Sequence, residues 1–190
     1  KGLNDKAIVR KFVQYENLQS LRQLELPTQS AVIELMKLDF ALTAMLSSDL
    51  MFAAGSEKAL FERIDVLRSG PAEFARGLDS DLPVFISEIL QIKLSHKAFN
   101  SEGVVVPFGS WKADKPGIRG YVKSLAAGSH ALVAANSGQE GGSISLPRRM
   151  RKTTKATIFT PNGQATCNLT DLPAAIELQP GQLLILLCEG

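Results

Sequence analysis

The stretch LSHKAFNSEGVVVPF, residues 94–108, marks the point at which the hydrophobic pattern of this chain changes. Up to Asn100 the apolar residues recur at helical spacing, and from Gly103 onward they fall in short runs separated by Gly and Pro. Helices followed by strands are typical of an α+β fold. The sequence therefore predicts two domains, a helical domain at residues 1–100 and an antiparallel β domain at residues 101–190.

The first domain is expected to be a helical bundle of about four helices. The second of these helices is apolar on more than one face, so we expect it to be central in the bundle. Its charged residues interrupt it too often for a membrane span. We expect Asp79-Ser80-Asp81 to cap the fourth helix rather than to hold a metal. Start and stop signals place the helices from Asn4 or Asp5 to Pro27, from Thr28 or Ser30 to Gly55, from Ser56 to Gly70, and from Asp79 to Leu94.

The second domain is expected to contain eight short strands. Their lengths and turn residues favour an antiparallel β-sandwich or a partly closed barrel. Asn162-Gly163 predicts a two-residue hairpin, and Pro180-Gly181 marks another turn. The last strand is apolar at every position from 183 to 187, which indicates burial on both faces. The predicted strands are 104–108, 118–125, 130–135, 143–146, 156–160, 164–168, 175–178 and 183–188.

The overall composition is that of an ordinary globular chain, with 45% hydrophobic and 21% charged residues. The formal net charge of +2 is too small to indicate nucleic-acid binding by itself. The charge is unevenly distributed, because residues 1–100 carry 12 basic and 13 acidic side chains and residues 101–190 carry 9 and 6. The predicted β domain is therefore mildly basic.

Two cysteines, Cys167 and Cys188, are too few for a disulfide framework. Both fall in predicted strands, where reduced core thiols are the usual state. A bridge becomes possible if their two strands are neighbours. The sequence shows no secretory signal and no transmembrane segment, so the localisation stays open.

The familiar motifs of catalysis are missing from the sequence. It contains no phosphate-binding loop, no nucleophile elbow and no metal-ligand spacing. His96 lies at the end of the fourth predicted helix, and His130 has no visible partners for a triad. The Gly-rich segment 138–142 lies between two predicted strands, so we expect a hairpin loop there rather than a phosphate site. We therefore predict no catalytic residue, no metal and no cofactor, and the sequence favours a non-enzymatic role; an enzyme that uses only Asp, Glu, Lys or Tyr stays open.

A basic loop is expected between two predicted strands. It places five positive charges within eight residues: Arg148, Arg149, Arg151, Lys152 and Lys155. Because so many charges cannot be buried, we expect the loop to lie in water or to contact an acidic protein surface, a nucleic-acid backbone or an anionic membrane. It contains no aromatic side chain for base stacking, which argues against single-stranded nucleic acid.

The single tryptophan, Trp111, lies in a loop rich in Gly and Pro. Burial of this side chain would fasten the loop over the helical layer, and this is the role we favour. An exposed indole would instead stack on a sugar or anchor a partner. Trp111 is therefore the second candidate contact.

Strand and turn segments in the second half resemble the β-sandwich that closes amylase-type glycoside hydrolases. The segments are 121–125, 131–138, 144–147 and 178–183. The resemblance includes none of that family's catalytic motifs, and the helical half does not resemble the barrel that would carry them. It implies a related β fold and assigns no site residue.

The sequence thus predicts a non-catalytic structural module for assembly or protein–protein interaction. The apolar second helix, the Trp111 loop and the basic loop are the candidate contacts, and a protein partner or self-association is expected. One alternative is the C-terminal accessory β-sandwich of a larger carbohydrate-active enzyme, for which Trp111 could contact carbohydrate. Another is backbone-directed nucleic-acid binding through the basic loop at 148–155.

Overall fold

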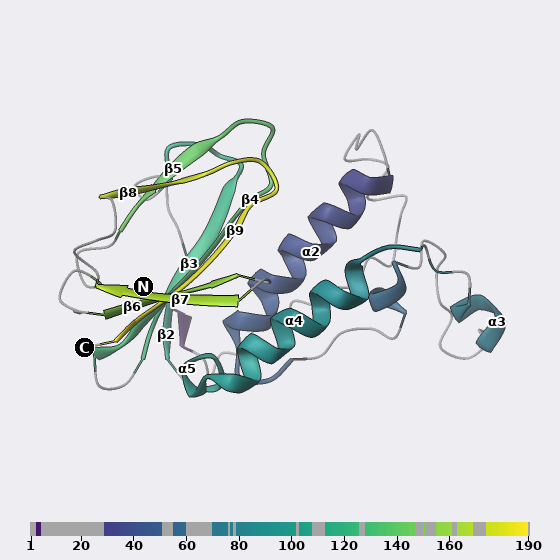
Figure 1. Cartoon of the computed structure of the whole chain (residues 1–190), viewed down its shortest axis with the longest axis horizontal. Coiled ribbons are helices and arrows are strands. Elements are labelled where there is room, and N and C mark those ends of the chain that lie inside the picture. Colours follow the sequence, from purple (N-terminus) through teal and green to yellow (C-terminus); the bar gives the residue numbers. More distant parts are fainter. Residues whose placement is uncertain are drawn as a thin grey trace.

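A large antiparallel sheet separates the helices from a second, smaller sheet (Figure 1). The strands are β1 (Leu3–Asn4), β2 (Val104–Pro107), β3 (Ile118–Ser124), β4 (His130–Asn136), β5 (Gly142–Ser145), β6 (Lys155–Thr160), β7 (Gly163–Asn168), β8 (Ala175–Leu178) and β9 (Leu183–Glu189). Among the described residues, the large sheet has the order β1-β2-β3-β4-β9-β6-β7, and the small sheet pairs β5 with β8. The computed structural model describes residues 3–4, 29–50, 55–59, 70–75, 77, 79–101, 103–107, 113–125, 128–146, 150, 155–160, 163–168 and 174–189.

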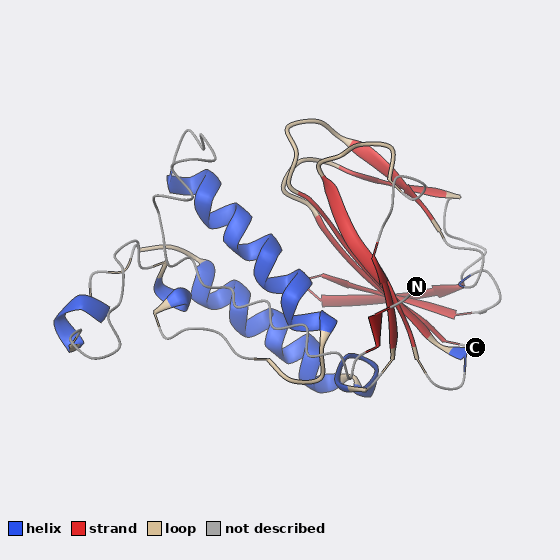
Figure 2. Ribbon diagram, turned by 180° about the vertical axis from the view of Figure 1, so that it is seen from behind, coloured by secondary structure: helices blue, strands red, loops and turns tan. Residues whose placement is uncertain are grey.

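The described helices lie on one side of the large sheet (Figure 2). They are α2 (Gln29–Leu46), the 3-10 helix η1 (Ser56–Lys58), α3 (Pro71–Phe74), α4 (Leu82–Ser95) and α5 (Lys97–Asn100). Helix α2 contacts β4 of the sheet, and α4 packs beside α2. Of these described helices, none combines the length and the apolar composition that crossing a bilayer requires. The coarse prediction of helices together with antiparallel sheets is therefore confirmed.

Helix α2 begins where the sequence predicted but ends at Leu46, well before Gly55. Residues 47–50 are irregular, and their sequence is Ser-Ser-Asp-Leu. Short polar side chains of this kind compete with helical backbone hydrogen bonds. The Ser47 carbonyl instead accepts a hydrogen bond from the buried Lys93 Nζ at 2.6 Å. The predicted helix end was therefore wrong.

Other helix predictions meet the structure only in part. Asn4, the expected cap of the first helix, lies in β1 and pairs with Val104 of β2. The rest of that predicted helix lies outside the described residues. Of the predicted third helix, the described part contains η1. The fourth is observed as α4, within one residue of the predicted end.

All eight predicted strands are present, each within one residue of its predicted ends. A hairpin joins β6 and β7 as predicted, because the two strands pair up to the Thr160–Gly163 partners, but Gly163 belongs to β7 and not to the turn. The hairpin expected at 138–142 is wrong. Strand β4 pairs with β3 and β9, whereas β5 pairs with β8, so this segment crosses from one sheet to the other. The order of the described strands ends at β1 and β7, so a closed barrel is not seen among them.

Strand β9 is central in the large sheet, between β4 and β6. Successive side chains of a strand point to opposite faces. Ile185 and Leu187 join the helices in one buried cluster, whereas Leu184 and Leu186 join a second cluster on the other face. The prediction that this strand is buried on both faces is confirmed.

The two clusters divide the core of the protein between the two faces of the large sheet. The helix-side cluster combines residues of α2, α4 and α5 with residues of the sheet, so helices and sheet share one core. The opposite cluster lies between the two sheets and includes Ile144 of β5 and Leu178 of β8. It also contains Met150, which is completely buried.

The register of the large sheet rules out a bridge between the two cysteines. Ala156 of β6 pairs with Cys167 of β7 on one side and with Cys188 of β9 on the other. The two cysteines are thus two strand spacings apart, about 9–10 Å. A disulfide requires Cα atoms closer than about 7 Å. The open possibility of neighbouring strands is therefore wrong.

Candidate functional site

The residues predicted to contact partners lie largely outside the described part of the chain. These are Trp111, Arg148, Arg149, Arg151 and Lys152. Lys155 opens β6, where its backbone pairs with Asn168 and Glu189. Met150, in the middle of the basic segment, is anchored in the core between the two sheets. The binding roles of the basic loop and of Trp111 remain predictions.

The two histidines occupy different kinds of position. His96 is the C-cap residue of α4, at the end where the sequence placed it, and its ring packs edge-to-face on Phe99 with centroids 6.2 Å apart. His130 opens β4, where the register pairs it with Ser124 and Cys188. Within the described residues, no group of three or more His, Cys, Asp or Glu side chains is placed to hold a metal.

The Asp79-Ser80-Asp81 triplet lies at the start of α4 as expected, although the Asp81 side chain does not supply the cap. Asp81 is the N-cap residue, but its side chain makes no capping hydrogen bond. Its Oδ2 accepts a hydrogen bond from Lys37 Nζ at 2.8 Å instead. The amide of Leu82 donates to Ser80 Oγ at 3.4 Å. The carboxylate thus links the start of α4 to α2 rather than satisfying helical amides.

Lys37 is the centre of a small ion-pair group between α2 and α4. Its Nζ also contacts Glu34 Oε1 at 2.7 Å and lies 5.9 Å from the centre of the Phe85 ring. Partial burial lowers the pKa of Lys37, but its hydrogen bonds to Asp81 and Glu34 outweigh this effect and raise it above its usual value. The hydrogen bond from Lys37 lowers the pKa of Asp81. The group stabilises the packing of the two helices.

The most extensive polar network lies at one end of the sheets, around Asn136 at the end of β4. The Asn136 side chain is completely buried. Its Nδ2 donates to the carbonyls of Leu178 at 2.9 Å and of Glu140 at 2.8 Å, and its Oδ1 accepts from the amide of Gly138 at 2.9 Å. One side chain therefore fixes the crossover from β4 to β5 and joins it to β8.

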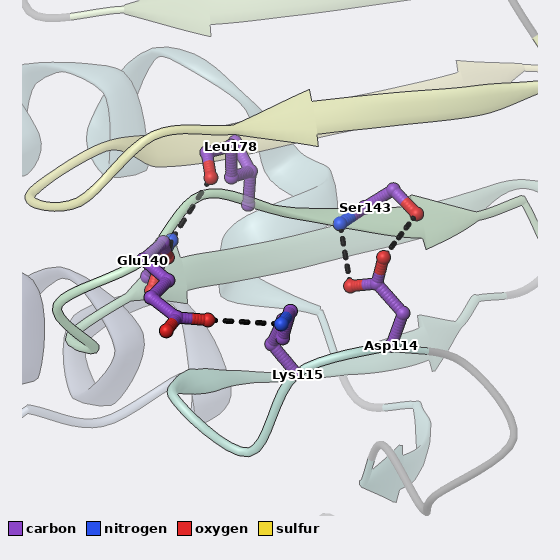
Figure 3. A network of polar contacts seen from close by, with 6 residues as sticks. Asp114, Lys115, Glu140, Ser143 and Leu178 are labelled. Carbon is purple, nitrogen blue, oxygen red and sulfur yellow. Dashed lines mark hydrogen bonds and ion pairs between the residues drawn. The ribbon is translucent and has the colours of Figure 1, made fainter.

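Two further polar pairs surround this centre (Figure 3). Asp114 accepts hydrogen bonds from the Ser143 amide at 2.7 Å and from the Ser143 hydroxyl at 2.9 Å. These bonds lower the pKa of Asp114. Lys115 Nζ lies 2.9 Å from Glu140 Oε2, and the hydrogen bond between them raises the pKa of Lys115 and lowers that of Glu140.

Glycines allow the segments of this network to approach one another. A Cβ atom on Gly117 would lie 2.5 Å from Gly138 Cα, so these two segments touch through backbone. Gly181 has a φ of 78° and follows Pro180 in the turn between β8 and β9, which the sequence predicted. Its amide donates to the Asn136 carbonyl at 2.9 Å. Three connections between strands are thus held together at this end of the sheets.

A second polar arrangement connects β3 to α2. Arg119 Nη2 lies 2.8 Å from Asp39 Oδ1, and the Tyr121 hydroxyl donates to the Leu42 carbonyl at 2.9 Å. Sequence reasoning missed these contacts, as it missed the Asn136 network, because the partners are far apart along the chain. Only the Asn136-Ser137-Gly138 sequence at a strand end gave a local signal of a turn.

Comparisons with known proteins give a likeness of fold. No protein-family model matches the sequence, and no curated protein matches it. An α-amylase of Anoxybacillus has a similar structure, with a TM-score of 0.60 and 13% identity, over 94% of this chain and 36% of that one. The α-amylase of Geobacillus thermoleovorans, solved with acarbose, has a TM-score of 0.54 and 14% identity, over 83% and 34%. The type I pullulanase of Bacillus subtilis, solved with maltose, has a TM-score of 0.54 and 12% identity, over 88% and 25%.

The shared fold extends beyond the segments within 121–183 that carry the sequence resemblance. A match over 94% of the chain necessarily includes most of residues 1–100 as well as most of residues 101–190. The chain nevertheless spans only about a quarter to a third of the length of these three structures. At such low identity, the likeness concerns the fold alone.

Proposed function

We propose that this chain is a non-catalytic structural module and that it serves as an accessory part of a larger carbohydrate-active enzyme. The observation that carries this proposal is the asymmetry of the fold likeness. Nearly all of this chain, 94%, matches only 36% of the Anoxybacillus α-amylase. The pullulanase gives the same picture, with 88% of this chain and 25% of that one. The remaining part of the neighbours' fold has no counterpart here.

The proposed architecture of the module is a helical bundle, at 1–100, followed by an antiparallel β-sandwich, at 101–190. Two observations support it. The helices gather on one face of the large sheet, and the small sheet covers part of the other. The helix-side core also contains Val105, Tyr121 and Ile185, so the two domains would be firmly joined. Such a module suits a supporting role, because it presents one rigid body to its partner.

The polar network around Asn136 supports a structural role for this end of the sheets. The partners of its polar groups lie within the chain. Lys115 pairs with the Glu140 side chain, Asn136 donates to the Glu140 carbonyl, and Asp114 accepts from the Ser143 amide. Hydrogen bonds made within the fold hold loops in place. The network therefore fits a fixed edge that keeps the two sheets in register. Under this proposal, the protein partner predicted from the sequence is the catalytic part of the same enzyme.

The proposal is tested on the polypeptide that carries this chain in its source cells. An antibody against the isolated chain of 20.5 kDa is used to precipitate that polypeptide. The precipitate is assayed for reducing ends released from starch and from pullulan. We expect hydrolysis of at least one glucan by the precipitate and none by the isolated chain, because the module itself supplies no catalysis.

The matched control is the same antibody blocked beforehand with the isolated chain, which should remove the activity from the precipitate. A precipitated polypeptide of the isolated chain's own mass would contradict the proposal. So would a larger polypeptide that releases no reducing ends from either glucan.

A further inference from the structure

The side chain of Lys93 lies where α2 and α4 end beside α5. Both longer helices run side by side toward α5 and contact it (Figure 1). Lys93 is in the last turn of α4 and is only 4% exposed. Its Nζ donates at 2.6 Å to the carbonyl of Ser47, the residue after α2, and at 3.1 Å to the carbonyl of Phe99 in α5. The Asn100 side chain donates in turn to the Lys93 carbonyl at 2.6 Å. One buried lysine thus joins three helices.

The local sequence does not by itself require α2 to end at Leu46. The segment 47–50, Ser-Ser-Asp-Leu, contains neither Gly nor Pro, which are the strongest helix breakers. Leu42, Leu46 and Leu50 follow a spacing of four residues, and all three pack against the helix-side core. A longer helix would therefore continue the same apolar stripe. The polar side chains at 47–49 make that helix less favourable, so a contact from outside the segment can decide where it ends.

The hydrogen-bonding needs of a buried lysine favour a helix that ends beside it. A lysine ammonium group donates hydrogen bonds and accepts none. A buried donor needs acceptors, and carbonyls inside a helix are already bonded to amides four residues further on. Carbonyls at the end of a helix have no such partner. If α2 continued, the Ser47 carbonyl would accept from the backbone amide at position 51, and Lys93 Nζ would have to share it.

We propose that Lys93 sets the length of α2. The buried amino group of α4 binds the Ser47 carbonyl and thereby keeps residues 47–50 irregular, whereas the same residues are helical when this donor is absent. Buried polar groups select one arrangement among several that pack similarly in some proteins, and Lys93 has this role here. The inference is independent of the proposed function, because it concerns contacts between described residues of this chain.

Carbon-13 chemical shifts of the labelled 190-residue chain test this proposal, because they report for each residue whether its backbone is helical. Lys93→Met removes the donor and keeps an unbranched side chain that adapts to a core. In the unsubstituted protein the helical shifts should end at Leu46, and in Lys93→Met they should continue at least through Leu50. Lys97→Met is the matched control, since Lys97 is exposed on α5, and it should leave the end at Leu46. A folded Lys93→Met protein in which α2 still ends at Leu46 would overturn the proposal.

A second variant removes the local cause instead of the contact. Ser47→Ala combined with Ser48→Ala replaces both serines by the best helix former and leaves Lys93 in place. The helical shifts should still end at Leu46, because the Ser47 carbonyl remains bound to Nζ. Helical shifts that continue through Leu50 in this variant would contradict the proposal. The double variant decides the question by itself if Lys93→Met does not fold.

Discussion

The two faces of the large sheet carry different chemistry. On the helix side, two polar side chains of β3 contact α2. Arg119 pairs with Asp39, and the Tyr121 hydroxyl donates to the Leu42 carbonyl. On the opposite side, the buried side chains that the structure describes in the sheet are apolar except for Asn136, and the polar contacts gather around this residue at the end of β4. Directional contacts between β3 and α2 thus position the helices. Apolar packing and the polar network around Asn136 position the small sheet.

This difference indicates how one sheet can position two layers. Apolar contacts are non-directional. An apolar face by itself therefore only weakly determines where the second layer lies along the sheet. A hydrogen bond within the interface specifies where a helix lies along the sheet. On the other face, the same task falls to the connections at 113–117, 137–141 and 179–182, which Asn136 and its neighbours join. Substitutions on the two faces should therefore have separable effects.

The largest effects should come from neighbouring residues of β9 that face opposite ways. Ile185 and Leu186 are both completely buried, one in each cluster. Either Ile185→Ala or Leu186→Ala should reduce the free energy of unfolding by about 2–5 kcal/mol, because each leaves a cavity. Chemical denaturation measures the loss. The two variants should be similar in size and different in location.

Hydrogen exchange locates the two losses. Ile185→Ala should accelerate exchange of the α2 amides, and Leu186→Ala should accelerate exchange in β5 and β8. If both variants accelerate the same amides, the two faces form a single cooperative unit and the comparison fails.

The next largest effect is expected at Asn136, in the polar network at the end of β4. Asn136→Ala removes three hydrogen bonds and leaves the Leu178 carbonyl without its side-chain donor in a buried place. The free energy of unfolding should fall by about 2–3 kcal/mol. Denaturation monitored by tryptophan fluorescence measures it.

Ser137→Ala is the control for this edge, because the partly buried Ser137 hydroxyl makes only one bond of 3.2 Å to the Gly117 carbonyl. Its cost should stay below about 1 kcal/mol. Equal costs for the two variants would show that Asn136 is not the centre of the edge.

The sequence predicted those parts of this comparison that depend on local patterns. Alternating apolar residues and turn residues located all eight strands to within one residue, and the continuous apolar run at 183–187 indicated burial on both faces. These signals are local, because side-chain direction along a strand follows from its period of two. The end of α2 was missed because Ser47 and its neighbours interrupt an apolar pattern that continues past them.

The contacts that join the layers could not be predicted in this way. Asp39 and Arg119 are 80 residues apart, and Asp114 and Ser143 are 29 apart. No local pattern states that 138–142 crosses between sheets, since a Gly-rich segment between strands also suits a hairpin. Met150 was overlooked because its charged neighbours dominated the interpretation. The predicted contacts at Trp111 and Arg148 lie outside the described residues, so they stay predictions.

A smaller effect is expected on the helix face. Tyr121→Phe keeps the ring in the helix-side core and removes only the hydroxyl that donates to the Leu42 carbonyl. The free energy of unfolding should fall by about 1 kcal/mol. Asp39→Asn should cost less than that, because Arg119 is 42% exposed and water screens the pair. If Asp39→Asn costs more than Tyr121→Phe, the ion pair rather than the hydroxyl positions α2.

The smallest effect should depend on pH and appear only at the sheet edge. Ser143 donates two hydrogen bonds to the Asp114 carboxylate, so the folded state lowers the pKa of Asp114 below its usual value near 4. A lowered pKa stabilises the fold above the unfolded value, and the stabilisation is lost as the pH falls through the folded value. Asp114→Asn should therefore lower Tm by about 1–2 °C at pH 7, because the site is exposed. The difference from the unsubstituted protein should shrink below about pH 4.

Ser143→Ala sharpens this last test, because it removes the hydroxyl donor and leaves the backbone amide in place. It should reproduce only part of the loss in Tm at pH 7, with the same decline toward low pH. Tyr121→Phe should give a loss that stays constant between pH 3 and pH 7, since a hydroxyl that donates to a carbonyl does not titrate in that range. A loss for Asp114→Asn that is equally independent of pH would show that the carboxylate charge does not hold the edge. The two faces would then differ only in where their hydrogen bonds lie and not in their chemistry.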